Sequence, residues 1–137
     1  MKQEKFQNLK PKQYLEYELG HAISRIDAKQ GIKLLEHDLA AVRKGTWTGL
    51  GEIGTASLVT EIYAKRKQEL QTRKKPWFSD AAFRAIDKAL IQIEHFGTED
   101  DLDKLEAFLP TVVNRKTDAV YTRVDWTVDR LKEKYAD

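Results

Sequence analysis

FRAIDKALIQIEHFGTEDDLDKLEAFL, residues 83–109, predicts two amphipathic helices joined by a capped turn. In the first, apolar side chains recur at three- and four-residue steps and share one face: Phe83, Ile86, Leu90, Ile93 and Phe96. Gly97 can take the left-handed conformation that closes a helix, and Thr98 with Asp101 predicts an approximate capping box for the next. That helix carries Leu102, Leu105, Phe108 and Leu109, and Pro110 ends it.

The N-terminal half of the chain predicts three more helices. The first starts at Pro11, ends near Gly31 and places four residues on its inward face: Leu15, Leu19, Ala22 and Ile26. The second has an apolar stripe that stops at Gly45: Ile32, Leu35, Leu39 and Val42. The third starts at Thr55, turns four side chains inward (Leu58, Val59, Ile62 and Tyr63) and breaks before Pro76.

Residues 45–54, GTWTGLGEIG, hold four of the seven glycines and fit either a short helix from Thr48 or an irregular connection. Residues 49–54 match the glycine spacing of a dinucleotide-binding motif. That motif needs a buried strand before it and a helix behind it, and the preceding residues predict no strand. A close approach of two backbones, or a hinge, is the better interpretation.

The C-terminal part predicts a last helix with a regular apolar face: Val120, Val124, Val128, Leu131 and Tyr135. Ser79 is a predicted cap for the helix over residues 83–96, and residues 111–117 a polar loop. No run alternates apolar and polar residues as a strand does. We therefore predict one all-α domain, residues 1–137, of five to seven helices in stacked antiparallel hairpins, with an irregular helical bundle as the alternative.

Residues 83–109 also suggest a family. Arg84, the Ala89-Leu90 pair and Ile93 precede Gly97, and both Gly97 and Gly54, 43 residues earlier, are followed by threonine and a helix. This pattern resembles the HEAT repeat, a helical hairpin that stacks side by side with its neighbours. The resemblance implies a short α-solenoid, whose concave face suits protein binding better than small-molecule chemistry.

Composition excludes several classes of chemistry. The chain has 137 residues, 41% hydrophobic and 34% charged, with a net charge of +2 and no cysteine. It therefore has no thiol catalyst, no cysteine-bound zinc and no disulfide. The N-terminal residues MKQEKFQNLKPKQ include no apolar signal region, and no window approaches the ~20 apolar residues of a membrane span. We expect a cytoplasmic protein without membrane association.

Candidates for a metal or catalytic site are few. Glu18 and His21 have the spacing that puts two ligands on one helix face, but a di-iron bundle needs two such pairs and two further glutamates. Glu36-His37 and Glu94-His95 are adjacent and diverge on a helix. No nucleophile with a base at a readable spacing is found. We expect no cofactor, no metal and no enzymatic activity.

The residues best suited to bind another protein are aromatic and acidic. Trp126 lies off the apolar stripe of the last helix, together with Tyr121, and the first turn of the helix after Gly97 is acidic: Glu99, Asp100, Asp101 and Asp103. Off-stripe aromatic residues either pack under other helices or serve as binding hot spots. The leading hypothesis is a non-enzymatic interaction protein, such as a small bacterial immunity or antitoxin-type protein that blocks a toxin.

The alternative is a helical nucleic-acid-binding subunit. Residues 65–77, KRKQELQTRKKPW, combine cations that can contact phosphates with an aromatic plane for a base: Lys65, Arg66, Lys67, Arg73, Lys74, Lys75 and Trp77. Cations at the C-terminal end of a helix also favour its dipole without any ligand. Both interpretations stay open at this point.

Overall fold

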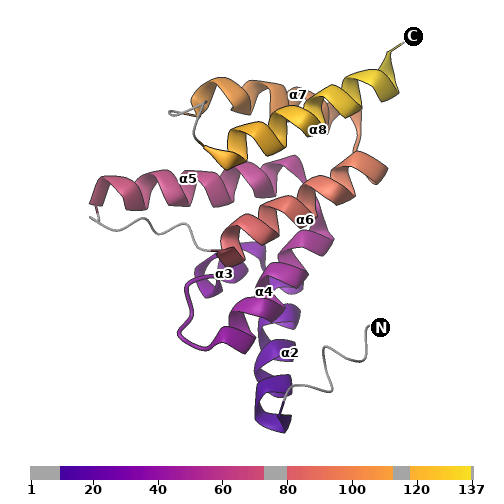
Figure 1. Ribbon diagram of the computed structural model, residues 1–137. Coiled ribbons are helices and arrows are strands. Elements are labelled where there is room, and N and C mark those ends of the chain that lie inside the picture. Colours follow the sequence, from indigo (N-terminus) through magenta and orange to yellow (C-terminus); the bar gives the residue numbers. More distant parts are fainter. Residues whose placement is uncertain (1–9, 73–79, 113–117, 137) are drawn as a thin grey trace.

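In the computed structural model, the described part of the chain is built from helices (Figure 1). The structure describes residues 10–72, 80–112 and 118–136, apart from the side chains of residues 66–72 and 80. The helices are α2 (Pro11–Ile26), α3 (Ala28–Leu34), α4 (Ala40–Ile53), α5 (Ala56–Thr72), α6 (Asp80–Phe96), α7 (Glu99–Phe108), the 3-10 turn η1 (Leu109–Thr111) and α8 (Ala119–Tyr135). These residues contain no strand, so the all-α prediction is confirmed.

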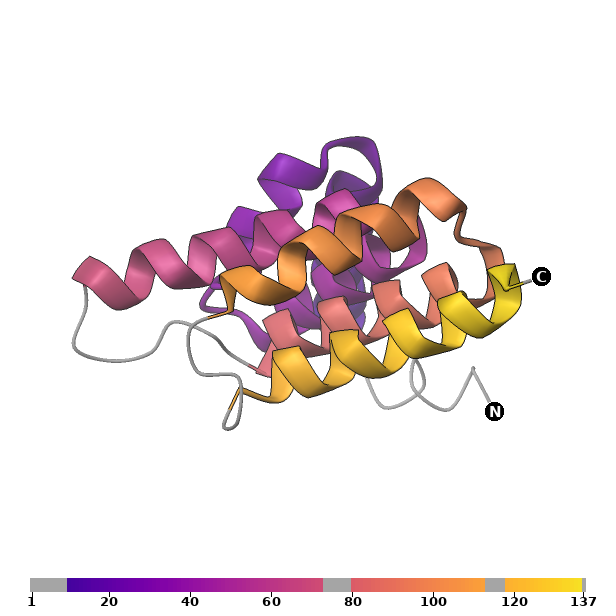
Figure 2. The ribbon, with the colours of Figure 1, turned by 90° about the horizontal axis from the view of Figure 1, so that it is seen from above.

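The helices form two groups that cross at a steep angle. In Figure 1, α2 and α4 run up the picture, whereas α5, α6 and α8 run across it. Seen from above in Figure 2, α5 to α8 have roughly aligned long axes. Helix α4 packs against α2 on one side and against α6 on the other, so α4 joins the two groups.

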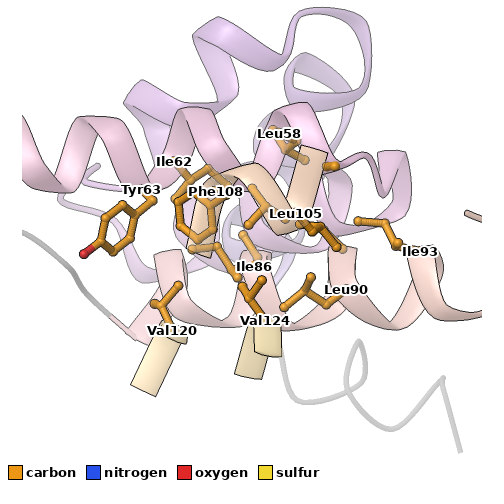
Figure 3. Close-up of a cluster of buried hydrophobic side chains, with 14 of the residues drawn as sticks. Leu58, Ile62, Tyr63, Ile86, Leu90, Ile93, Leu105, Phe108, Val120 and Val124 are labelled. Carbon is orange, nitrogen blue, oxygen red and sulfur yellow. The ribbon is translucent and has the colours of Figure 1, made fainter. Parts of the chain in front are cut away.

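The main hydrophobic core lies among α5, α6, α7 and α8 (Figure 3). Ten side chains from these four helices point toward one another, and each is at most 6% exposed: Leu58, Ile62, Tyr63, Ile86, Leu90, Ile93, Leu105, Phe108, Val120 and Val124. The rings of Tyr63 and Phe108 meet edge to face, 5.1 Å apart. The apolar faces predicted for α5, α7 and α8, and most of that for α6, are therefore confirmed.

Helix α6 is the central element, because it is covered on two sides. Besides the predicted face, its alanines are buried: Ala81, Ala82, Ala85 and Ala89. The prediction was wrong for Phe96, which is 79% exposed. Gly54 ends α4 against Gln92, one turn before Phe96. No part of α4 therefore extends far enough to cover the Phe96 ring.

The turn between α6 and α7 has the predicted capping box. The Thr98 N–H donates to Asp101 Oδ2 at 3.1 Å, and the Asp101 N–H donates to Thr98 Oγ1 at 3.3 Å. Gly97 follows α6 directly, but the glycine with a positive φ among the described residues is Gly54, at 57°. Helix α7 ends at Phe108, and Pro110 lies in η1. The predicted cap Ser79, the break at Pro76 and residues 113–117 fall outside the described residues.

The glycine-rich segment is helical over most of its length. Helix α4 passes through Gly45, Gly49 and Gly51 and ends at the left-handed Gly54. A Cβ on Gly45 would overlap the Tyr17 carbonyl oxygen, and one on Gly49 would lie 2.7 Å from the His21 carbonyl oxygen. The glycines therefore let the backbones of α2 and α4 touch, and the close-approach interpretation holds.

The inward face predicted for α2 was wrong. Three of its four residues are exposed leucines or isoleucines: Leu15 (69%), Leu19 (54%) and Ile26 (87%); Ala22 is exposed as well. The face that packs on α4 instead carries buried Gly20 and Ser24. The prediction failed because apolar periodicity gives no weight to small residues, and small residues make this contact.

The second predicted helix is in fact two helices. Helix α3 ends at Leu34, and α4 begins at Ala40, so Gly31 and Gly45 lie inside helices rather than ending them. The turn between them is held by the Arg43 guanidinium, which donates to the carbonyl oxygens of His37 and Asp38 at 2.6 and 3.0 Å. Of the predicted stripe, Ile32, Leu35 and Val42 are buried and Leu39 is 42% exposed.

Candidate protein-binding surface on α6 and α8

Trp126 belongs to α8 and is 46% exposed. Two arginines of the same helix flank its indole ring: the guanidinium carbon of Arg123 is 5.1 Å from the ring centroid and that of Arg130 is 4.4 Å. These positions are three residues before and four after Trp126, so all three share one helix face. Cation–π contacts at such exposed sites contribute about 0.5–1 kcal/mol each. They hold the ring in place while leaving much of it accessible.

Carboxylates of α6 anchor both arginines. Arg123 Nε lies 2.6 Å from Asp87 Oδ1, and its Nη1 donates to Thr127 Oγ1 at 2.6 Å. Arg130 Nη1 lies 3.9 Å from Glu94 Oε1. Asp87 and Glu94 are seven residues apart, as are Arg123 and Arg130, so the two ion pairs show that α6 and α8 run in the same direction. The tighter pair is also the more buried, since the Arg123 side chain is only 17% exposed.

Ile91 completes this surface from the α6 side. It lies four residues after Asp87 and three before Glu94, and it is 42% exposed. The two ion pairs set the register of α6 against α8, and this register places Ile91 at the level of Trp126 and Thr127. We call these six residues the Trp126 surface: Asp87, Ile91, Glu94, Arg123, Trp126 and Arg130. It is an exposed apolar centre bounded by two ion pairs.

The other predicted binding residues do not join Trp126. Tyr121 is half-buried and packs against the core. Trp126 lies on the flank of α8 that pairs with α6, whereas α7 meets α8 through Lys132 and Glu106, 3.2 Å apart. Lys132 is six residues after Trp126 and so points about 120° away from it. The acidic turn of α7 is therefore a separate surface.

Within that acidic turn, the residues differ in what they contact. Asp101 caps α7, and its Oδ1 also accepts a hydrogen bond from the Ala56 N–H at the start of α5, at 3.2 Å. Asp101 is therefore a structural residue that joins two helix ends. Asp100 pairs with Lys104 at 3.1 Å, and Glu99, Asp100 and Asp103 are exposed.

Of the candidate metal residues Glu18 and His21, His21 lies in the contact between α2 and α4 and Glu18 does not. His21 Nε2 is 2.7 Å from Glu52 Oε1, and Arg25 Nη1 is 3.3 Å from the same oxygen. Tyr17 stacks on His21 with ring centroids 6.1 Å apart. Glu18 is exposed, and no group of three or more potential metal ligands occurs in the described residues. His21 and Glu52 therefore serve to fasten α2 to α4.

The basic run can be followed only at its first residue. Lys65 Nζ lies 3.6 Å from Glu36 Oε2, between α5 and the segment after α3. The remaining side chains, from Arg66 to Trp77, lie outside the described residues, so the nucleic-acid hypothesis stays a prediction.

A shallow groove runs between α5 and α7. Small side chains line much of it (Ser57, Thr60, Ala64 and Ala107), and Lys104 Nζ crosses its end to reach Ser57 Oγ at 3.3 Å. Lys104 Nζ also lies 3.1 Å from Asp100 Oδ2, so it is an ion-pair partner as well as a donor to Ser57. Among these surfaces, the Trp126 surface is the one in which neighbouring side chains flank an exposed aromatic ring.

Sequence reasoning selected Trp126 but missed Ile91, Arg123 and Arg130. The sequence did contain a signal for the two ion pairs, because Asp87 and Glu94 have the same seven-residue spacing as Arg123 and Arg130. The chain matches no protein family model, no curated protein and no solved structure. Among the described helices, none has the length and apolar content needed to cross a membrane.

Proposed function

We propose that this chain is a non-enzymatic protein-binding protein and that the Trp126 surface is its principal contact site. One observation carries the proposal: a half-exposed tryptophan is held between two arginines that are themselves anchored to a second helix. Tryptophan and arginine are the residues most enriched in binding hot spots. A side chain already held in one conformation loses less entropy on binding, which favours affinity.

The surface also indicates the chemistry of the partner. Trp126 and Ile91 offer an apolar contact at its centre, so the partner should place an apolar side chain there. Arg130 forms the longer of the two ion pairs, and its side chain is 51% exposed. Its guanidinium N–H groups can therefore donate hydrogen bonds to a partner. A carboxylate on the partner beside that apolar side chain would pair with Arg130.

A narrower form of the proposal is a small bacterial immunity or antitoxin-type protein that acts in the cytoplasm and blocks a toxin domain. It is supported by the size and helical architecture of the chain. The exposed acids Glu99, Asp100 and Asp103 would steer a cationic partner toward it. Stacking of hairpins as in HEAT repeats belongs to the same proposal, with the α6–α7 hairpin as its best-defined unit.

The test is capture of a partner from the native host with the full chain, followed by a titration of the purified partner. Trp126→Ala should weaken binding by at least about 30-fold, the factor that corresponds to a hot spot of about 2 kcal/mol. Lys132→Ala changes an exposed residue of α8 that points about 120° away from Trp126, and it is the matched control. Equal affinity of wild type and Trp126→Ala would overturn the assignment of this surface.

The same preparations test the nucleic-acid alternative. If the chain binds single-stranded RNA, and if that binding falls steeply with added salt and is lost when Lys74 and Lys75 become glutamate, the basic run is the functional site. RNA binding that Trp126→Ala leaves unchanged would then replace the protein-binding proposal.

A further inference from the structure

Helix α2 presents an apolar stripe on the side opposite its contact with α4. Leu15, Leu19, Ala22 and Ile26 are all exposed, and Ile26 is the most exposed large apolar residue described, at 87%. Figure 1 shows the N-terminal part of α2 at the end of the molecule opposite α7 and α8. A contiguous apolar stripe on a surface helix marks an interaction site.

The spacing of this stripe is that of a coiled-coil seam. Successive members are four, three and four residues apart, which is the alternation of a and d positions in a heptad. Leu15 and Ala22 take d positions, and Leu19 and Ile26 take a positions. The stripe therefore fits one further helix lying nearly along α2.

The charges beside the stripe select a second copy of α2 in the antiparallel direction. Glu18 and Arg25 both occupy g positions, on the same flank. In an antiparallel pair the g flanks face each other, so Glu18 approaches Arg25 of the second copy, and the twofold axis repeats the pair. A parallel pair would instead bring Glu18 to Ile23 and leave Arg25 opposite a residue beyond the end of α2.

The apolar layers agree with this direction. With the twofold axis between Leu19 and Ala22, Leu15 lies opposite Ile26 of the second copy and Leu19 lies opposite Ala22. No like charges meet, since Glu16 on the other flank faces Ile23. Arg25 already lies 3.3 Å from Glu52, but its side chain is 57% exposed and a guanidinium has five donors.

We propose that two copies of this chain associate through an antiparallel pairing of α2. The interface is isologous, so it closes after two copies and leaves the Trp126 surface of each copy accessible. Two sixteen-residue helices form an interface in the size class of weak, transient complexes, so the association should be reversible. The proposal does not depend on the proposed function, because it involves different residues.

Sedimentation equilibrium of the full chain over a wide concentration range tests this pairing. The expected result is a reversible shift from 15.9 kDa toward twice that mass. Leu19→Glu puts a charge beside the axis and should raise the dissociation constant at least tenfold. Phe96→Glu changes an exposed apolar residue of α6 that lies outside both α2 and the Trp126 surface, and it should leave association unchanged. Circular dichroism checks that both variants remain helical.

Charge exchange tests the direction of pairing. Glu18→Arg and Arg25→Glu should each weaken self-association, because like charges then face each other. A mixture of the two variants should form mixed dimers at least tenfold more tightly than either forms alone. Equal self-association of the single variants, with no preference for the mixed dimer, would overturn the antiparallel arrangement.

Two other results would also overturn the proposal. A chain that stays monomeric at several hundred micromolar, but forms a Leu19-dependent dimer once residues 1–9 are removed, would show that its own N-terminal segment covers the stripe. A chain that stays monomeric and captures a different protein only while Leu19 is intact would show that another partner covers it.

Discussion

Where α2 crosses α4 the contacting residues are Gly20, Ser24, Gly45 and Gly49, whereas among α5 to α8 they are leucines, isoleucines and valines. The first contact depends on how closely two backbones approach and removes little apolar surface from water. The second buries large side chains from four helices. The stability of α5 to α8 therefore comes from hydrophobic burial, while the position of α2 comes from shape and from the His21, Arg25 and Glu52 group.

The largest effect is expected in the core of α5 to α8. Leu90→Ala removes a fully buried side chain and should lower the free energy of unfolding by about 2–5 kcal/mol, measured by urea denaturation. Ile91→Ala, the matched control one residue later, should cost less than about 1 kcal/mol because Ile91 is 42% exposed. Equal losses would contradict the placement of the core.

The contact between α2 and α4 should be sensitive to one methyl group. Gly45→Ala forces a Cβ against the Tyr17 carbonyl and should destabilise the docking of α2 by about 1–3 kcal/mol. Hydrogen exchange should speed up in α2 and remain slow in α6. In a helix without this contact, alanine would stabilise by up to about 1 kcal/mol over glycine. The sign of the change in stability therefore shows whether α2 and α4 touch at Gly45. Lys44→Ala, at an exposed neighbour, should leave exchange unchanged.

The capping interactions of Asp101 at the starts of α5 and α7 should contribute less to the free energy of unfolding than the core does. Asp101→Ala removes the acceptor for the Thr98 and Ala56 N–H groups, so two helix starts lose a cap and the free energy of unfolding should fall by about 1–2 kcal/mol. Asp100→Ala removes only the surface pair with Lys104 and should cost about 0.2–0.5 kcal/mol. If the two variants were equally stable, Asp101 would not be the joint cap described here.

The two groups of helices also differ in how much of them the sequence predicts. Residues 83–109 carry an apolar face and a capping box, and both are local signals that packing preserves. On α2 the apolar stripe is as regular, yet the side that packs is marked only by Gly20 and Ser24. Periodicity identifies a helix face that avoids water, but it does not say whether this chain or another molecule covers that face.

The candidate site was also only partly predictable from local sequence patterns. The sequence identifies Trp126 as an aromatic residue off the core stripe. The position of Ile91, and the separation of Trp126 from the acids of α7, depend on which flank of α8 meets α6. That arrangement is set by packing among distant helices, which no local pattern reports.

Only a small effect on stability is expected at Trp126, and Trp47 is the tryptophan to compare with it. Each ring lies beside an arginine, but Trp47 is half-buried against the core, whereas Trp126 is 46% exposed. Trp47→Ala should therefore lower the free energy of unfolding by about 3 kcal/mol, and Trp126→Ala by about 1–2 kcal/mol, the sum of its two cation–π contacts. Urea denaturation of both variants measures the difference. If Trp126→Ala cost as much as Trp47→Ala, Trp126 would be a packing residue, and any loss of partner binding in that variant would reflect unfolding rather than a lost contact.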